Sequence, residues 1–423
     1  YQISNTGGTK INLNGVYNSG ATLPSGNLNY QGDIWMDING GAFGIIAGGV
    51  TNEWSTKLQT STLTGDTHVQ LSGDATAEHV IGGNNKGAST TLTGNTNVTV
   101  KDNAIVAGAI IGGSTSAHNA VTTITGNTSV LVTNVQYSNT AQNLDGGLSN
   151  SYIIGGSSWS SNTTSGTTIQ GSTSATINLN GITLSGTEEH NSFVKTIIGG
   201  SYGNVNNAGT VNNINGDTSV SIIGREGITF TGDIIGGSFE NSGQAQYTIG
   251  GNSSISISGG STFTGNIYGG SYSKVPGNTG STMTTAGNIT VELGTGTYRG
   301  NIYGAGNKGT AGGDVLVSLT GGSVFGAEGE QSGITIGGSA GAAVEGNRTL
   351  ELKGTFGDAD FQYASFTQFD KIDVTGEGSS ATIYSLTESA RLEKTGAGRL
   401  TLGANAAGAE TILGGITEGI SIT

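Results

Sequence analysis

Cysteine, proline and charged residues are absent or scarce in this chain. Its 423 residues include no cysteine and two prolines. Without cysteine it can form no disulfide, no thiolate metal site and no cysteine nucleophile. Charged residues make up 10% of the chain, against about 25% in an average protein, and with so little proline this is unlike an ordinary disordered tail. No uninterrupted apolar run approaches the ~18 residues that a membrane-spanning helix needs.

The few charged residues are mostly acidic. The chain has 29 Asp and Glu against 15 Lys and Arg, which gives a net charge of −14. Phosphate backbones and anionic lipids repel such a surface. We therefore expect neither nucleic acid nor an anionic membrane surface as a partner.

Glycine, by contrast, is abundant, and it marks a repeat. There are 78 glycines and no Gly-X-Y period, which excludes collagen. Many of them open a motif that reads Gly, Asn/Asp/Ser, Thr, x, apolar, x, apolar, as in Gly94–Val100 and Gly126–Val132. We count ten copies, the first starting at Gly7. Apolar residues at every second position predict a strand with one buried and one solvent-facing side.

Two further elements alternate with this strand. One reads Ile-Ile-Gly-Gly, as at Ile153–Gly156 and Ile197–Gly200, and the other is a short run such as Thr91–Thr93. Three short strands per repeat, each ended by glycine, are typical of a coil. From Gly65 onward the repeat length is 26 to 45 residues, in the range of solenoids, propellers and arrays.

A solenoid explains these features better than a propeller. Propeller blades need hairpin turns at fixed places, and Asn-Gly or Asp-Gly pairs are only sporadic here. The sequence therefore predicts an all-β fold, a parallel β-solenoid, in the form of a right-handed three-strand β-helix of about ten coils. At ~4.8 Å per coil those ten coils would be roughly 45–50 Å long. Thr and Asn at repeated positions are expected to form hydrogen-bonded columns between coils.

The pattern divides the chain into three parts. Residues 1–44 are expected to form the first coil and an N-terminal cap that includes an insertion, 16–43. Residues 45–354 carry the glycine-rich solenoid repeats. Residues 355–423 are expected to continue the β-helix with a different residue pattern, which includes clustered phenylalanines.

The C-terminal part contains a run, Leu392–Leu402, with the core Lys-Thr-Gly-x-Gly-x-Leu-x-Leu. Over residues 391–420 the chain resembles the autotransporter-associated β-strand repeat, and the Ile-Tyr-Gly-Gly coils resemble glycine-rich passenger repeats of bacterial surface proteins. The resemblance implies a type V secretion passenger, a β-helical stalk that a C-terminal β-barrel exports to the cell surface. We read the chain as a mature or excised fragment, whose only membrane contact would be through a barrel outside this sequence.

Catalytic and metal-binding patterns are weak. An acid/base enzyme would need converging carboxylates, and the best groups are Asp358 with Asp360, Asp370 with Asp373, and Glu188–His190. The four histidines, His68, His79, His118 and His190, have no metal-ligand spacing, so we expect no metal or organic cofactor. Two hypotheses remain: a structural and adhesive surface rod that is not an enzyme, and a polysaccharide-cleaving β-helix enzyme, either a lyase or a glycosidase.

Two adjacent coils carry longer loops, 133–150 and 180–193, which predict a contact surface for a glycan or protein of a host or bacterial surface. The expected contact residues are Tyr137, Asp145, Trp159, Glu188, Glu189, His190 and Phe193.

A second expected partner is another copy of the chain. Residues 415–423 still alternate like a strand, with no capping segment after them. Because open strand edges pair with other chains, we expect end-to-end stacking into a homo-oligomer.

Overall fold

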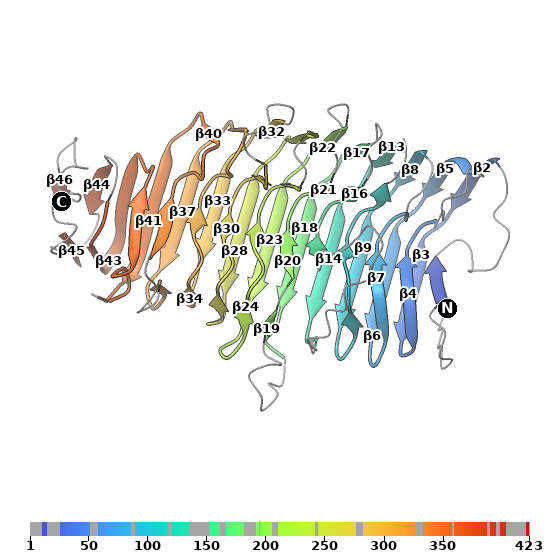
Figure 1. The fold of residues 1–423 in the computed structure, drawn as a ribbon, viewed down its shortest axis with the longest axis horizontal. Coiled ribbons are helices and arrows are strands. Elements are labelled where there is room, and N and C mark those ends of the chain that lie inside the picture. Colours follow the sequence, from blue (N-terminus) through green and yellow to red (C-terminus); the bar gives the residue numbers. More distant parts are fainter. Residues whose placement is uncertain are drawn as a thin grey trace.

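The repeated strands stack into coils along one axis, with the first described coils at one end and the last at the other (Figure 1). The computed structural model describes residues 11–14, 26–50, 58–85, 89–116, 121–135, 152–160, 166–181, 192–193, 195–204, 210–241, 244–275, 282–326, 333–357, 359–386, 390–394, 398–402 and 420–422. Every strand pairing between these residues is parallel, which confirms the predicted β-solenoid. None of them belongs to a helix long and apolar enough to cross a membrane.

Sheet A contains the strands of the glycine-led repeat motif. Each strand pairs in register with the strand one coil away, so that Val130 lies between Val98 and Ala175. Its strands are β3 (Ile34–Asn39), β6 (Thr67–Ser72), β9 (Thr96–Lys101), β14 (Thr128–Thr133), β18 (Thr173–Asn178), β23 (Thr218–Ile223), β28 (Ser253–Ser258), β33 (Ile289–Leu293), β37 (Val315–Thr320), β41 (Arg348–Thr355), β43 (Lys371–Ile383), β44 (Arg391–Lys394), β45 (Gly398–Leu402) and β46 (Ile420–Ile422).

Sheet B contains the Ile-Ile-Gly-Gly strands. It is buried on both faces, as a continuous apolar run in a parallel sheet predicts: Ile234 packs in the main core and Ile235 in a second cluster on the opposite side. Its strands are β1 (Ile11–Asn14), β4 (Ala42–Ala47), β7 (Thr76–Ile81), β10 (Ile105–Val106), β11 (Ile110–Ile111), β15 (Tyr152–Ile154), β20 (Thr196–Ile198), β25 (Ile234–Ile235), β30 (Ile267–Tyr268), β35 (Ile302–Tyr303), β39 (Ile334–Gly337) and β42 (Ala364–Thr367).

Sheet C contains the third predicted strand, which leads into sheet A. In several coils a residue at or next to the end of this strand packs in the main core, as Leu92, Ile124 and Ile169 do. Its strands are β2 (Gly26–Gln31), β5 (Leu58–Thr64), β8 (Ser89–Thr93), β13 (Val121–Ile124), β17 (Gly166–Ile169), β22 (Val211–Ile214), β27 (Gln246–Ile249), β32 (Thr282–Thr285), β36 (Thr310–Ala311) and β40 (Ala343–Val344).

Two short sheets were not predicted. Sheet D follows the Gly-Gly turn after sheet B: β12 (Thr115–Ser116), β16 (Ser158–Ser160), β21 (Tyr202–Asn204), β26 (Phe239–Glu240) and β31 (Tyr272–Ser273). Sheet E lies between sheets A and B: β19 (Ser192–Phe193), β24 (Thr229–Phe230), β29 (Thr262–Phe263), β34 (Thr297–Tyr298) and β38 (Val324–Phe325). A coil that includes all of these sheets therefore has five strands, and those of sheets D and E have only two or three residues each.

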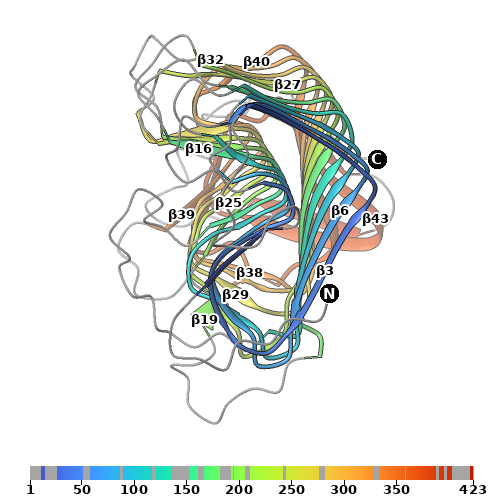
Figure 2. The same ribbon diagram turned by 90° about the vertical axis from the view of Figure 1, so that its right-hand side faces the viewer.

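Figure 2 looks along the axis from the N-terminal end. Sheet A forms the right-hand wall, sheet C the top, sheet E the bottom and sheet B the left-hand wall, and sheet D projects to the left from the top of sheet B. The chain descends through sheet A and rises through sheet B as it recedes from the viewer, so the coil is right-handed.

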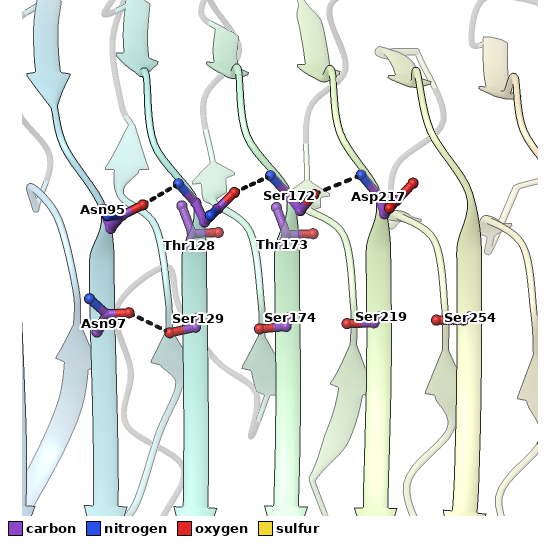
Figure 3. A pocket seen from close by; sticks show the side chains of 11 residues that line it. Asn95, Asn97, Thr128, Ser129, Ser172, Thr173, Ser174, Asp217, Ser219 and Ser254 are labelled. Atoms are coloured by element: carbon purple, nitrogen blue, oxygen red, sulfur yellow. Dashed lines mark hydrogen bonds between the residues drawn. The ribbon is translucent and has the colours of Figure 1, made fainter.

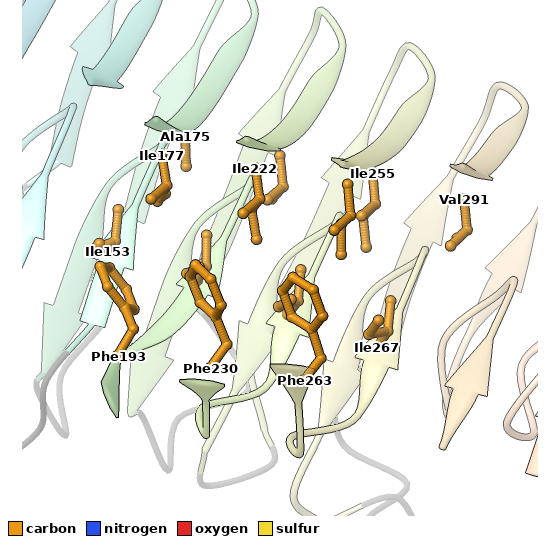
Figure 4. Packing of buried hydrophobic residues seen from close by; sticks show 14 of the residues in the cluster. Ile153, Ala175, Ile177, Phe193, Ile222, Phe230, Ile255, Phe263, Ile267 and Val291 are labelled. Atoms are coloured by element: carbon orange, nitrogen blue, oxygen red, sulfur yellow. The ribbon is translucent and has the colours of Figure 1, made fainter. Parts of the chain in front are cut away.

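Apolar columns fill the space between the walls. All eighteen predicted core positions from Val69 to Leu352 are at most 2% exposed. Sheet E adds a ladder of aromatic rings whose neighbouring centroids lie 4.9–5.3 Å apart. Figure 4 shows Phe193, Phe230 and Phe263 of this ladder. The rings of this ladder belong to Phe193, Phe230, Phe263, Tyr298 and Phe325.

Glycine in the Ile-Ile-Gly-Gly turns is required by the close approach of successive coils. A β-carbon on Gly155 would collide with the carbonyl oxygen of Gly199, and one on Gly112 with that of Gly155. These glycines do not have positive φ angles. Packing between coils therefore requires glycine at the Gly-Gly pairs, and an argument from backbone conformation alone would not predict this.

The first coil differs from the predicted alignment of the repeat motif. The strand that contains Ile11 and Leu13 pairs with β4 in sheet B, so it is not a sheet A strand. The first described sheet A strand is β3, in which Ile34 occupies the place of the motif's threonine. The predicted insertion, 16–43, is wrong for residues 26–43, which form regular strands of this coil because Met36 and Ile38 supply the two buried positions.

Candidate functional site

The outer face of sheet A carries a groove of about 560 Å³. Strands β9 to β28 position it, because the side chains that alternate with the buried positions must point to solvent. Figure 3 shows the polar side chains following one another from coil to coil. The lining residues are Asn95, Asn97, Asn127, Thr128, Ser129, Ser172, Thr173, Ser174, Asp217, Ser219 and Ser254.

One edge of the groove is a ladder of hydrogen bonds between successive coils. Asn95 Oδ1 accepts a bond from the backbone N–H of Asn127 at 2.9 Å, and Asn127 Oδ1 accepts one from Ser172 N at 2.8 Å. The ladder continues through Ser172 Oγ to the N–H of Asp217, at 3.0 Å. Each side chain therefore binds the backbone of the next coil, and bonds between identical side chains, which the sequence had suggested, are secondary.

The threonines beside this edge also bond differently from the prediction. Thr128 Oγ1 donates to the carbonyl oxygen of Gly155 at 2.5 Å, and Thr173 Oγ1 donates to that of Gly199 at 2.6 Å. These bonds cross the interior from sheet A to the Gly-Gly turn after sheet B. The threonine column is therefore a buried connection between two walls and is not available to a ligand.

The floor of the groove, by contrast, has free polar atoms. Within the described part of the chain, the hydroxyls of Ser174, Ser219 and Ser254 have no hydrogen-bond partner in the protein, and all three are half-buried side chains (Figure 3). Ser129 Oγ donates to Asn97 Oδ1 at 2.7 Å. A regular line of unengaged hydroxyls can therefore donate to and accept from a polar ligand.

Two aromatic rings stand at the N-terminal end of the same row. Trp35 and His68 are register partners on β3 and β6, and their rings stack at a centroid distance of 3.8 Å with an 11° angle between planes. Trp35 is 65% exposed, the most exposed large hydrophobic side chain in the described residues. His68 Nδ1 lies 3.4 Å from Asn97 Nδ2, which joins the aromatic pair to the first lining residues.

The C-terminal end of this face is charged. Lys371 Nζ lies 2.8 Å from Asp373 and 2.6 Å from Glu393, and Arg348 pairs with Asp370 at 2.6 Å. The bonds to the two carboxylates raise the pKa of Lys371, and the bond from Arg348 lowers the pKa of Asp370. The charged end and the neutral groove are thus separate parts of one face.

Most of the contact residues expected from the sequence lie outside the described residues: Tyr137, Asp145, Glu188, Glu189 and His190. Trp159 lies in β16 of sheet D, and the structure describes its backbone only. Phe193 was wrongly placed on a contact surface. It is 2% exposed and belongs to the sheet E ring ladder, 4.9 Å from Phe230.

The candidate catalytic groups are engaged separately. Asp360 accepts a bond from Gly357 N at 2.6 Å, Asp370 pairs with Arg348 and Asp373 with Lys371, while Asp358 lies outside the described residues. His79 is buried and accepts a bond from Ala109 N at 2.9 Å. Over the part of the chain that the structure describes, no group of three or more His, Asp or Glu side chains could hold a metal ion.

Sequence reasoning missed the groove, although a signal for it exists. The residue after the motif's threonine is Trp35, His68, Asn97, Ser129, Ser174, Ser219, Ser254 and Thr290 in successive coils. The prediction treated these residues as solvated positions between core residues. Reading them down the column, from one coil to the next, reveals the aromatic pair and the neutral row beside it.

Comparisons of the chain with protein-family models, with curated proteins and with solved structures found no match.

Proposed function

We propose that the chain is a β-helical rod that acts as a structural and adhesive passenger on a bacterial cell surface, where it contacts a surface glycan or protein. The observation that carries the proposal is the outer face of sheet A. There a groove of about 560 Å³ lies across five consecutive strands and offers unengaged hydroxyls to solvent.

The rod architecture supports this role. Each coil bonds to the next through backbone ladders and side-chain ladders, so the outer face is held in a fixed arrangement along the axis. A rigid, repetitive face can make many weak contacts at once, and such contacts together bind far more strongly than each one alone. Adhesion to a repetitive surface depends on such multiple weak contacts.

The resemblance of residues 391–420 to the autotransporter-associated β-strand repeat supports placement at the cell surface. In that repeat region β44 continues sheet A in register with β43, so the run is part of the rod. Surface display by a barrel outside this sequence is part of the proposal.

An adhesion assay tests the proposed function. Beads coated with the protein should adhere to bacterial or host cells under flow, whereas beads coated with heat-unfolded protein should not. Equal adhesion of the two bead types would contradict the proposal. Release of reducing ends or unsaturated sugars from the cell surface would favour the alternative, a polysaccharide-cleaving enzyme.

A further inference from the structure

We infer that the groove on sheet A binds an uncharged glycan chain that lies along the rod axis, with one end at Trp35. This inference rests on the proposed function, because it names the ligand of the same face. Its support comes from the free hydroxyls, the coil spacing, the charge distribution and the exposed aromatic pair.

The free polar atoms fit sugar hydroxyls. Ser174, Ser219 and Ser254 can each donate one hydrogen bond and accept two, and Asn127 Nδ2 is a further donor without a protein partner in the described residues. A hydrogen bond between a serine hydroxyl and a sugar hydroxyl replaces bonds that both groups make to water, so each such bond contributes little net binding free energy. Affinity therefore depends on many of these bonds forming together. A polyhydroxylated chain provides them.

The spacing of the row also fits an extended glycan. Successive strands of a sheet lie ~4.8 Å apart, which is close to the advance of one sugar unit in an extended chain. Ser129, Ser174, Ser219 and Ser254 are register partners on four consecutive strands. Each sugar unit can therefore lie opposite one of these serine hydroxyls.

The charges select against acidic glycans. From Trp35 to Thr290 the row has no Lys, Arg, Asp or Glu, and the charged residue in the lining is Asp217, whose Oδ1 already accepts a bond from Asn252 N at 2.7 Å. A carboxylated or sulfated chain would meet no cation in this row and would be repelled by a protein of net charge −14. The ligand class is therefore a neutral glycan.

The aromatic pair defines one end of the site. Because Trp35 and His68 are register partners with parallel rings, the ring faces point along the rod axis. His68 lies between Trp35 and Asn97, so it covers the face of the indole that points toward the groove and leaves the outer edge and the far face of the indole exposed. A glycan that leaves the groove passes over His68 before it reaches this exposed part. The apolar C–H face of a terminal sugar can pack on this exposed ring, as apolar groups do on aromatic surfaces.

Binding is tested with purified oligosaccharides by calorimetry on the full chain. The neutral probes are the hexasaccharides of β-1,4-linked glucose, xylose and mannose, and the acidic probe is the hexamer of galacturonic acid. We expect at least one neutral probe to bind and the acidic probe to bind at least about tenfold more weakly. Failure of all three neutral probes to bind, or tighter binding of the acidic one, would overturn the inference.

Variants locate the site. Ser219→Tyr fills the groove, whereas Ser221→Tyr places the same ring on the same strand and face, outside the lining. We expect Ser219→Tyr to abolish binding, Ser221→Tyr to leave it unchanged, and Trp35→Ala to weaken it up to about tenfold. Equal affinity of Ser219→Tyr and Ser221→Tyr would place the glycan elsewhere and refute the inference.

The adhesion assay separates this inference from the proposed function. If coated beads adhere and Ser219→Tyr beads adhere equally well, the adhesive function stands and the groove is not its site. If no beads adhere while the oligosaccharides bind the groove, the inference stands and the proposed function fails. Circular dichroism of each variant checks that the strand content is unchanged.

Discussion

At the residue scale, two charged side chains stand out in the described interior, Glu240 and Lys195, which are both at most 2% exposed. Lys195 is 2% exposed, and its Nζ donates to the carbonyl oxygens of Ala107, at 3.2 Å, and Gly108, at 2.5 Å. Burial lowers the pKa of this lysine to about 7, against about 10.4 in an unfolded chain. The folded protein therefore holds fewer protons on this group than the unfolded chain does between these two values.

This difference gives a pH dependence with a definite sign. Since the unfolded state binds more protons between about pH 7 and pH 10, the contribution of Lys195 to the free energy of unfolding should rise with pH over that range. Replacing Lys195 with Met should flatten that rise and increase stability near pH 7. Denaturant titrations of the wild-type protein and the Lys195→Met variant at several pH values measure this difference. The same dependence of the free energy of unfolding on pH in both proteins would contradict the lowered pKa of Lys195.

An apolar position gives the converse prediction. Val130 is 1% exposed between Val98 and Ala175. Val130→Asp would place a carboxylate without a partner in the core, so we expect a loss of about 3–5 kcal/mol of stability, or local unfolding of the neighbouring coils. The exposed neighbour supplies the control, because Leu131→Asp should change stability by less than about 0.5 kcal/mol. Comparable losses from both variants would show that the faces are misassigned.

At the element scale, the sequence predicts the strands of sheets A, B and C but not those of sheets D and E. Period-two alternation marks sheet A, and the Ile-Ile-Gly-Gly run marks sheet B. The sheet E strands have two residues each, so they show no period, although the recurring pairs Thr229-Phe230 and Thr262-Phe263 reveal them once coils are aligned. Phe193 was misplaced for that reason.

The candidate site is less predictable than the fold, because it is built from one residue per coil. No local motif joins Trp35 to Ser254, which are more than two hundred positions apart in the sequence. Only the register between coils brings them into one row. Side-chain bonds that cross the interior, such as the one from Thr128 to Gly155, also depend on tertiary geometry that local patterns do not contain.

The crossing bonds lead to a prediction for sheet A and sheet B together. Thr128→Val keeps the shape but removes the donor to Gly155 O, so this buried carbonyl loses its bond and stability should fall by about 1–3 kcal/mol. Thr176→Val, on the outer face of β18, serves as the matched control and should be nearly neutral. Thermal unfolding of the two variants compares them, and an equally neutral Thr128→Val would show that the crossing bond contributes nothing.

At the scale of the whole molecule, sheet A has an open edge among the described strands, since β3 is paired only with β6. Open edges pair with other chains, and head-to-tail stacking of such rods does not close into a ring. We therefore propose that isolated rods stack end to end into filaments. Light scattering should then report a mass that grows with concentration, and a constant monomer mass at high concentration would refute the proposal.

The most direct test of the ligand-binding face is a crystal structure of the chain with the neutral hexasaccharide that it binds best. The account predicts electron density for the sugar along the outer face of sheet A, over the row from Asn97 to Ser254, with its end at Trp35. Density for the sugar on another face, with that row bare, would contradict it.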